Sequence, residues 1–305
     1  MLRYHGGKWR LATWVMTFFP PHRVYVEPYG GAASVLIQKP RVYAEIYNDL
    51  DGEIVNVFRV LQDPAGAARL EQLLRVTPFA RKEFEGVAYT PSSDPVESAR
   101  RTIMKSFMGF GSSAIHGRSR GMRTRASVWG TGSGECMTGF RTRISTHPDP
   151  RTTGFRSNSN RSGTTPAHDW ANWPDAIVGF VERLAGVVIE CQDGLKVMAT
   201  HDRPDSLHYV DPPYVRATRS KARKRKAEYR FEMTDDEHRL LATCLHGLQG
   251  CVVLSGYQSD LYAELYAGWE RHDRQTLADG ARKRLESVWL SPRTSAALHE
   301  VKLAL

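Results

Sequence analysis

The sequence predicts a doubly wound α/β domain, with a mixed but mostly parallel sheet, interrupted by a smaller and largely helical insertion. Short apolar runs alternate with helical patterns before residue 75 and after residue 168, and this alternation is typical of parallel strands covered by helices. With 305 residues, 41% of them hydrophobic, the chain is long enough for one large domain and an insertion. We therefore expect residues 1–74 and 169–305 to form one domain and residues 75–168 to form the insertion.

The first alternating unit lies before residue 75. The apolar run 24–26 is expected to be a strand, residues 27–31 turn the chain, and the composition of 32–38 predicts a helix. A second strand is expected over 42–46, followed by a helix with apolar positions within 54–61. The order is therefore strand, turn, helix, strand, helix.

The insertion has a different composition. Thr77 and Pro78 end the preceding helix, and one further helix is predicted over 98–110. The stretches 109–139 and 157–165 are rich in Gly, Ser and Arg and have no regular apolar pattern.

Regular patterning resumes after the insertion. A helix is expected around 174–184, and another over 234–248, where Thr234 and Glu237 have the spacing of a capping box. Strands are expected over 187–189, in the run ending at Val210, over 251–254 and over 288–290.

Composition narrows the class of protein. No apolar stretch approaches the roughly 20 residues of a membrane span, and the N-terminal residues do not form a signal-peptide pattern. The four cysteines show no paired spacing typical of a zinc site. We expect a cytoplasmic protein with reduced thiols, no membrane contact and no metal.

The net charge of +9 is concentrated in two stretches. Basic residues exceed acidic ones by ten over 100–161 and by seven over 216–230, so the rest of the chain is net acidic. A basic stripe on an acidic body is the pattern of a polyanion-binding protein. Two solvated basic loops without a partner would give the same composition.

The tetrapeptide Asp211, Pro212, Pro213, Tyr214 carries the strongest functional signal. It follows the short apolar run 207–210, so it is expected where a buried strand ends. Ligands bind at the carboxyl ends of the strands in an open α/β sheet. A proline-rich turn with a capping aspartate is the alternative interpretation.

Two earlier clusters have features of a ligand site. Tyr4, Gly6, Gly7 and Lys8 combine glycines that allow close backbone approach with a cation for an anionic group; a flexible N-terminus is the alternative. The turn 27–31 precedes an expected helix and contains paired glycines, although it lacks the full dinucleotide-binding spacing.

Asp49 follows the second expected strand. An acid at this place in such folds accepts hydrogen bonds from ribose hydroxyls. Taken alone, an Asp after Asn at a strand end is also typical of a turn or a helix cap.

In order along the chain, Tyr4-x-Gly6-Gly7-Lys8, Glu27-Pro28-Tyr29-Gly30-Gly31, Asn48-Asp49 and Asp211-Pro212-Pro213-Tyr214 resemble the motifs of the Dam-type DNA adenine-N6 methyltransferases. The resemblance covers residues 1–65 and 170–295 and implies a Rossmann-like methyltransferase fold with a target-recognition insertion. The joint order of the motifs is far more specific than any one of them.

The resemblance implies binding of S-adenosyl-L-methionine (AdoMet) and no metal. Lys8 would pair with the methionine carboxylate, and Asp49 would hold the ribose. Asp193 falls where the family has an acid near the cofactor adenine, but Gly194 replaces the usual aromatic residue. Ala32 and Ala33 replace further glycines. The full set of cofactor residues implied in this way is Tyr4, Gly7, Lys8, Glu27, Pro28, Gly30, Gly31, Asp49, Asp193 and Asp211.

The tetrapeptide also suits the chemistry of a nucleobase amine, whose lone pair is delocalised into the ring. If the Asp211 carboxylate and the Pro212 carbonyl each accept one N–H, the lone pair can localise on nitrogen. The prolines hold that carbonyl at low entropic cost, and Tyr214 would stack on the extruded base.

The predicted activity is methyl transfer to the N6 amine of a flipped adenine in double-stranded DNA, in a bacterial or phage-infected bacterial cell. The same chemistry leaves DNA cytosine-N4 and RNA amino-methylation open, and the fold alone would suit a non-catalytic DNA-binding protein. A cognate restriction enzyme stays open as a second partner. The basic residues expected to contact DNA are Arg216, Arg219, Lys221, Arg223, Lys224, Arg225, Lys226, Arg118, Arg120, Arg123 and Arg125.

Overall fold

A computed structural model describes residues 2, 7–88, 90–109, 165–218, 230–277 and 283–303, together with the backbone of four two-residue strands between 125 and 143. The chain forms two compact units. One comprises residues 1–6 and 59–182, and the other comprises residues 7–58 and 183–305. The segment predicted as an insertion, residues 75–168, lies within the first of these units.

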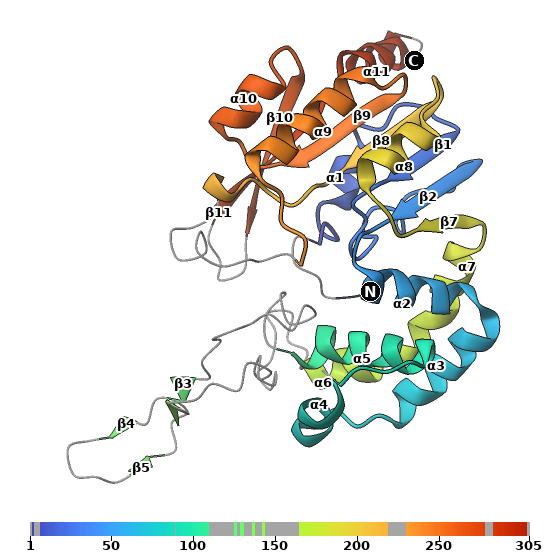
Figure 1. Cartoon of the computed structure of the whole chain (residues 1–305), viewed down its shortest axis with the longest axis vertical. Helices are drawn as coiled ribbons and strands as arrows, with labels where there is room; N and C mark the ends of the chain where they lie inside the picture. The colour runs from blue at the N-terminus through green and yellow to red at the C-terminus, as the bar shows by residue number, and fades with distance from the viewer. Residues whose placement is uncertain are drawn as a thin grey trace. The chain divides into compact units, whose positions relative to one another are not determined.

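The second unit is built on a seven-stranded sheet with the strand order β10-β11-β9-β8-β1-β2-β7 (Figure 1). The pairs β7–β2, β2–β1, β1–β8 and β8–β9 are parallel, whereas β11 runs antiparallel to both β9 and β10. This confirms the predicted mixed, mostly parallel sheet. The strands are β1 (Val24–Glu27), β2 (Ala44–Asn48), β7 (Val187–Glu190), β8 (Ser206–Val210), β9 (Cys251–Gly256), β10 (Glu270–Leu277) and β11 (Lys283–Leu290).

The order of the strands creates a switch point beside β1. The chain runs from β1 to β2 on one side of the sheet centre and later returns to place β8 on the other side of β1. Both neighbours are parallel to β1, so the carboxyl ends of β1, β2 and β8 share one edge of the sheet. In doubly wound folds this is where ligands bind.

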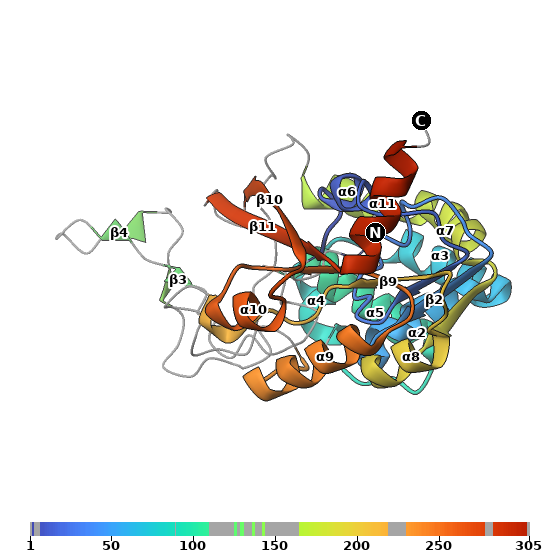
Figure 2. The same ribbon diagram turned by 90° about the horizontal axis from the view of Figure 1, so that it is seen from above.

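Helices cover both faces of this sheet. Figure 2 shows α8 (Gly194–His201) and α9 (Asp235–Gly247) on one face and α11 (Pro292–Leu303) on the other. Parallel strands covered on both sides are mostly apolar. Every residue of β1 and of β8 is buried, including the polar Glu27, Ser206 and His208.

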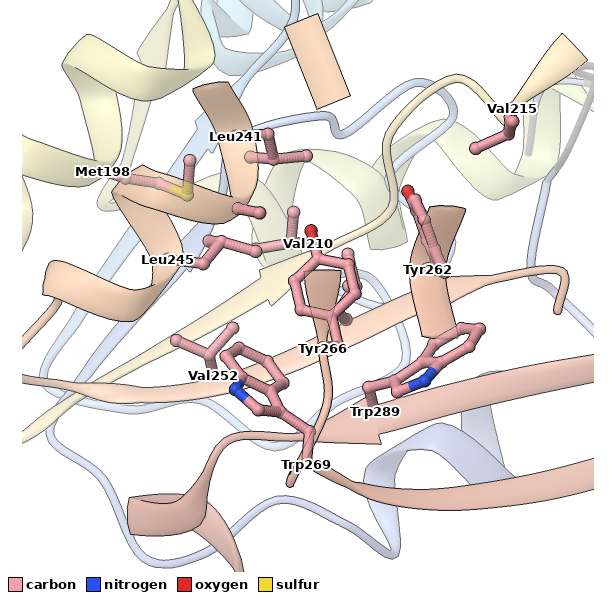
Figure 3. Close-up of a cluster of buried hydrophobic side chains, with 12 residues drawn as sticks. Met198, Val210, Val215, Leu241, Leu245, Val252, Tyr262, Tyr266, Trp269 and Trp289 are labelled. Carbon is pink, nitrogen blue, oxygen red and sulfur yellow. The ribbon is translucent and has the colours of Figure 1, made fainter. Parts of the chain in front are cut away.

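The core on the α9 face is rich in aromatic residues (Figure 3). Val252 of β9 packs there beneath Leu245 of α9. The ring of Tyr262, in α10 (Asp260–Leu265), meets Trp289 of β11 edge-on at 5.2 Å. Ring pairs of this kind contribute beyond the area that they bury, so they fix the antiparallel end of the sheet.

Successive side chains of β1 point to opposite faces of the sheet. Val24 and Val26 of β1 pack with Val197 of α8, whereas Tyr25 meets Phe19 at a ring distance of 5.9 Å. Phe19 follows α1 (Ala12–Met16) and also packs against Tyr209 of β8. The N-terminal segment therefore reaches the face of the sheet opposite α8.

The first unit is largely helical in its described part. Trp170 donates a hydrogen bond from its indole N–H to the Thr77 carbonyl oxygen at 2.9 Å and packs against Phe107. The unit boundaries fall within α2 (Gly52–Gln62) and α7 (Ile177–Leu184). The other elements are α3 (Pro64–Val76), α4 (Arg81–Val87), α5 (Pro95–Met108), α6 (Pro166–Ala171), η2 (Pro174–Ala176) and the strands β3 (Arg125–Ala126), β4 (Trp129–Gly130), β5 (Cys136–Met137) and β6 (Thr142–Arg143).

The predicted helix over 32–38 is wrong. The segment forms consecutive turns, because Ala33 has a left-handed φ of 51° that an α-helix cannot include. The Leu36 N–H donates to the Glu27 carboxylate at 3.0 Å instead of continuing a helix. This backbone conformation costs an L-residue roughly 1 kcal/mol or more, so the surrounding contacts hold it in place.

The predicted capping box is confirmed. The Thr234 side chain accepts from the Glu237 N–H, and the Glu237 carboxylate accepts from the Thr234 N–H at 2.6 Å. Among the described residues, no helix is long and apolar enough to cross a membrane.

Candidate active site

Asn48 ties together three loops at the carboxyl edge of the sheet. Its side-chain amide donates to the carbonyl oxygens of Pro28 at 2.8 Å and Gln192 at 2.9 Å, and its Oδ1 accepts from the Gln192 N–H. The side chain is fully buried. The loops that follow β1, β2 and β7 are therefore held by one residue.

The glycine turn after β1 rests on β2. Gly30 N–H donates to the Asn48 carbonyl oxygen at 2.8 Å, and the Tyr47 hydroxyl donates to the Gly31 carbonyl oxygen at 2.6 Å. A Cβ at Gly30 would lie only 2.1 Å from the Tyr47 ring. Glycine is required at position 30 because an aromatic ring occupies the space of any side chain.

Asp49 supports the same turn. Its Oδ2 accepts from the Gly31 N–H and its Oδ1 from the Asp51 N–H, each at 2.8 Å. Asp51, which precedes α2, forms an ion pair with Arg230 at 2.7 Å. The Asp49 carboxylate therefore joins the glycine turn after β1 to the start of α2.

Glu27 ends β1 as a buried carboxyl group. Its Oε2 accepts from the Tyr25 hydroxyl at 2.8 Å and from the Leu36 N–H at 3.0 Å. Burial raises the pKa of Glu27 to about 8, although both hydrogen bonds oppose this shift. Glu27 is therefore largely protonated at neutral pH and holds the turn over 31–38 to the strand.

Lys8 and Asp211 form the centre of the site. The Lys8 Nζ lies 2.9 Å from the Asp211 Oδ1, and the Lys8 side chain is 5% exposed. Asp211 stands at the carboxyl end of β8 with 16% of its side chain exposed. A carboxylate at the edge of the site is thus paired with a cation buried beneath it.

Tyr214 and Glu286 complete this cluster. Lys8 donates to the Tyr214 hydroxyl, which in turn donates to Glu286. The Glu286 Oε1 also lies 3.1 Å from the Lys8 Nζ. Glu286 belongs to β11 and was not among the residues predicted from the sequence.

Burial and charge act in opposite directions on the central pair. Burial would lower the pKa of Lys8, but Asp211 and Glu286 outweigh it and raise that pKa well above its usual value. Burial raises the pKa of Asp211 above its usual value, and the Lys8 cation limits that rise. Lys8 is therefore positively charged throughout the physiological range of pH.

Aromatic neighbours cover the Tyr214 ring. Tyr257 meets it edge-on with ring centroids 4.4 Å apart, and the Lys8 Nζ lies 4.6 Å from its centroid. Arg284 donates to the Tyr257 hydroxyl at 3.1 Å. Tyr214 is only 6% exposed, so stacking of a base on its ring would require neighbouring side chains to move.

Asp193 caps α8. Its Oδ1 accepts from the N–H groups of Leu195 at 2.8 Å and Lys196 at 3.2 Å, and its side chain is exposed. A Cβ at Gly194 would lie 3.0 Å from the Tyr29 ring. The absence of a side chain at 194 therefore makes room for an aromatic ring supplied by the turn after β1.

The structure brings most of the sequence-predicted cofactor and catalytic residues to this edge. Pro28 and Pro212 are buried, Pro213 is partly buried and Gly7 is exposed. Arg216 is exposed in η3 (Arg216–Thr218). Outside the described residues lie Tyr4, Arg219, Lys221, Arg223, Lys224, Arg225, Lys226, Arg118, Arg120 and Arg123, and of Arg125 only the backbone, in β3, is described.

Across those described ranges, no three His, Cys, Asp or Glu side chains gather in a way that would hold a metal ion. The site instead contains a buried ammonium group, carboxylates and aromatic rings at a strand edge. This donor set suits binding and orientation of an organic substrate.

Comparison with known proteins agrees with the geometry. The family model for the D12 class N6 adenine-specific DNA methyltransferases matches residues 4–89 and 155–279. A search of the curated proteins finds no match. The two matched segments make up more than half of the chain and include Lys8, the glycine turn, Asp49 and the 211–214 tetrapeptide. The chain therefore belongs to the D12 class of N6 adenine-specific DNA methyltransferases.

Proposed function

We propose that Asp211, with Lys8 and Tyr214 around it, is the catalytic centre of this DNA adenine-N6 methyltransferase. The observation that carries the proposal is the position of the Asp211 carboxylate, at the carboxyl end of β8 beside β1, with the Lys8 ammonium 2.9 Å away. That edge is the switch point of the sheet, where doubly wound folds bind their substrates.

Asp211 and Pro212 would prepare the adenine amine for reaction. The carboxylate and the Pro212 carbonyl each accept one N–H of the amine, so the nitrogen lone pair is withdrawn from the ring and can act as a nucleophile. Lys8 favours the ionised form of Asp211, which is the form that accepts a hydrogen bond. The pair thus favours a carboxylate acceptor at the edge of the site.

AdoMet supplies an electrophilic methyl group on a sulfonium when it is bound. The residues present fit this cofactor, because Asp49 and Asp193 provide carboxylate acceptors at the ends of β2 and β7 for hydroxyl and amine groups. The turn through Gly30 and Gly31 offers backbone at the same edge. We propose these residues, with Lys8, Glu27 and Pro28, as the cofactor site.

The substrate is DNA, and we propose that the target adenine leaves the double helix. An exocyclic amine cannot be reached within a stacked duplex. Tyr214 would then contact the extruded base after Tyr257 moves from its ring. We propose residues 75–168 as the target-recognition segment and the basic stretch 216–230 as a contact to the DNA backbone. The enzyme would act in the cytoplasm of a bacterial or phage-infected bacterial cell.

Identification of the methylated product tests the proposed function. The full chain is incubated with AdoMet and either duplex DNA of mixed sequence or structured RNA, and the product is digested to nucleosides for mass spectrometry. We expect N6-methyladenine in DNA and no methylation of RNA. Methylation at cytosine N4 or of RNA would contradict the proposed substrate, and AdoMet binding without any transfer would indicate a non-catalytic scaffold.

A further inference from the structure

We propose that Glu286 is a positioning residue for methyl transfer, acting through Lys8 and Tyr214 without touching the adenine. The inference rests on the proposed roles of Asp211 and Tyr214. Glu286 lies on β11, which runs antiparallel to both of its neighbours. This strand is distant in sequence from the motifs that identify the family.

The sheet register explains how Glu286 reaches the site. Val210 of β8 lies opposite Leu254 of β9, and Ser287 of β11 lies opposite Gly256 of β9. The residue before Ser287 therefore stands just beyond the carboxyl end of β9, level with the loop that begins at Asp211. The antiparallel direction of β11 carries a carboxylate to the edge where the parallel strands end.

The contacts of Glu286 fix two groups at once. Its Oε1 accepts from the Tyr214 hydroxyl and lies 3.1 Å from the Lys8 Nζ. Lys8 also donates to that hydroxyl and to Asp211. Loss of the Glu286 carboxylate would remove the acceptor of the Tyr214 hydroxyl and one of the two carboxylates that lie beside the Lys8 Nζ in this cluster.

Fold stability alone does not account for the carboxylate. Glu286 is 4% exposed, and burial of a charge costs free energy that an ion pair often fails to recover relative to apolar side chains of similar size. The next residue on the same face, Val288, is apolar and fully buried. A carboxylate at 286 is better explained by the charge and orientation that it imposes on Lys8 and Tyr214.

The charged and titratable groups that face Asp211 come from four elements. They are Lys8 from the N-terminal segment, Glu286 from β11, Glu27 from β1, and Tyr209 and Tyr214 from β8 and the loop that follows it. Glu286 raises the pKa of Asp211, whereas Lys8 lowers it. Removing the charge at 286 and removing the charge at 8 should therefore shift the pKa of Asp211 in opposite directions.

The test compares Glu286→Gln, Glu286→Leu and Lys8→Met with the wild-type chain, using single-turnover methyl transfer as a function of pH and AdoMet affinity by calorimetry. Glu270→Gln is the matched control, because Glu270 is an exposed carboxylate of the same hairpin that pairs with His272. We expect Glu286→Leu to lower the transfer rate by roughly tenfold or more, equal to at least about 1.4 kcal/mol. Glu286→Gln retains an acceptor for the Tyr214 hydroxyl and should lose less.

The pH profile distinguishes positioning from simple structural support. The acid limb of the rate should move to lower pH in Glu286→Gln and to higher pH in Lys8→Met. In a double-mutant cycle, Tyr214→Phe combined with Glu286→Leu should be less damaging than the sum of the single effects, because both remove the same hydrogen bond. Glu270→Gln should match wild type in each measurement.

Wild-type rates and an unmoved acid limb in both Glu286 variants would overturn the inference, as would a lower rate with additive effects and no pH shift. A wild-type chain that transfers no methyl group would instead refute the proposed function. If Glu286→Leu does not fold, the comparison of Glu286→Gln with Lys8→Met still decides between the opposite pH shifts and their absence.

Discussion

Lys8 shows what motif order predicts about a residue and what it leaves open. The order of the motifs predicts that Lys8 shares a site with Glu27, Asp49 and Asp211, and in the structure Lys8 lies beside Asp211. Its expected partner was the methionine carboxylate of AdoMet, whereas in the structure Asp211 and Glu286 are its partners. A motif reports which residues share a pocket, but the hydrogen bonds depend on side chains about 200 positions apart.

Glu286 could not be found by the same reasoning. The strand signal recognised in the sequence began at Val288, two residues beyond it. The strand in fact begins at Lys283 and pairs with β10, which was not predicted because its alternation of charged and polar residues carries little apolar signal. A buried carboxylate within a polar stretch looks like a surface residue until the pairing of the strands is known.

At Glu27 the raised pKa predicts a pH-dependent stability. The folded state binds a proton that the unfolded chain releases near pH 4.5, while the folded pKa is about 8. Stability should therefore be highest below pH 4.5 for this group and fall as the pH rises to about 8, by an amount on the order of 3–5 kcal/mol.

Glu27→Gln, which keeps the acceptor for Tyr25 and Leu36, should flatten this dependence and be more stable than wild type at pH 8. Urea unfolding at several pH values between 5 and 8.5 measures it. Parallel pH profiles for the variant and wild type would show that Glu27 is ionised in the folded protein. Glu264→Gln, at an exposed site in α10, should retain the wild-type profile.

At the scale of elements, the parallel strands and the helices α2, α5, α7 and α9 were predicted, whereas the helix predicted over 32–38 is wrong. The predicted strand 24–26 and the run ending at Val210 form most of the buried strands β1 and β8, so their local composition was enough to predict them. The turn over 31–38 depends on contacts with β2 and on a left-handed Ala33. Helix-forming composition was overridden there by tertiary hydrogen bonds.

Gly30→Ala tests how strictly this turn is built. The new Cβ would lie 2.1 Å from the Tyr47 ring, so the ring or the turn must shift, with an expected loss of at least about 2 kcal/mol. Gly247→Ala in α9 meets nothing within 4 Å and should change stability by no more than about 1 kcal/mol. Urea unfolding of both variants is the measurement, and equal stabilities would contradict the packing described here.

At the scale of the whole molecule, the surplus of positive charge is concentrated in the stretches that the sequence predicts to contact DNA. The net charge is +9, and the stretch 216–230 alone contributes seven of the surplus positive charges. Its two described ends are Arg216, five residues after Asp211, and Arg230, paired with Asp51 near the glycine turn. Both ends therefore lie on the compact unit that holds the site.

Neutralising Lys224, Arg225 and Lys226 to Gln should weaken binding to every DNA sequence alike. If all three contact phosphates, the slope of log affinity against log salt should fall by about 2.7. Arg203→Gln with Arg293→Gln, two exposed residues near the amino end of β8, is the control and should leave the slope unchanged. The same slope in the triple variant would show that this stretch does not contact the DNA backbone.

The most direct test of the central claim is methyl transfer by Asp211→Ala, measured beside its affinity for AdoMet. Loss of the acceptor for the adenine amine should lower the rate by at least about 100-fold while AdoMet binding stays detectable. Asp205→Ala, an exposed residue just before the same strand, should transfer methyl groups at the wild-type rate. An Asp211→Ala variant that keeps a tenth or more of the wild-type rate would contradict the assignment of Asp211 as the catalytic acceptor.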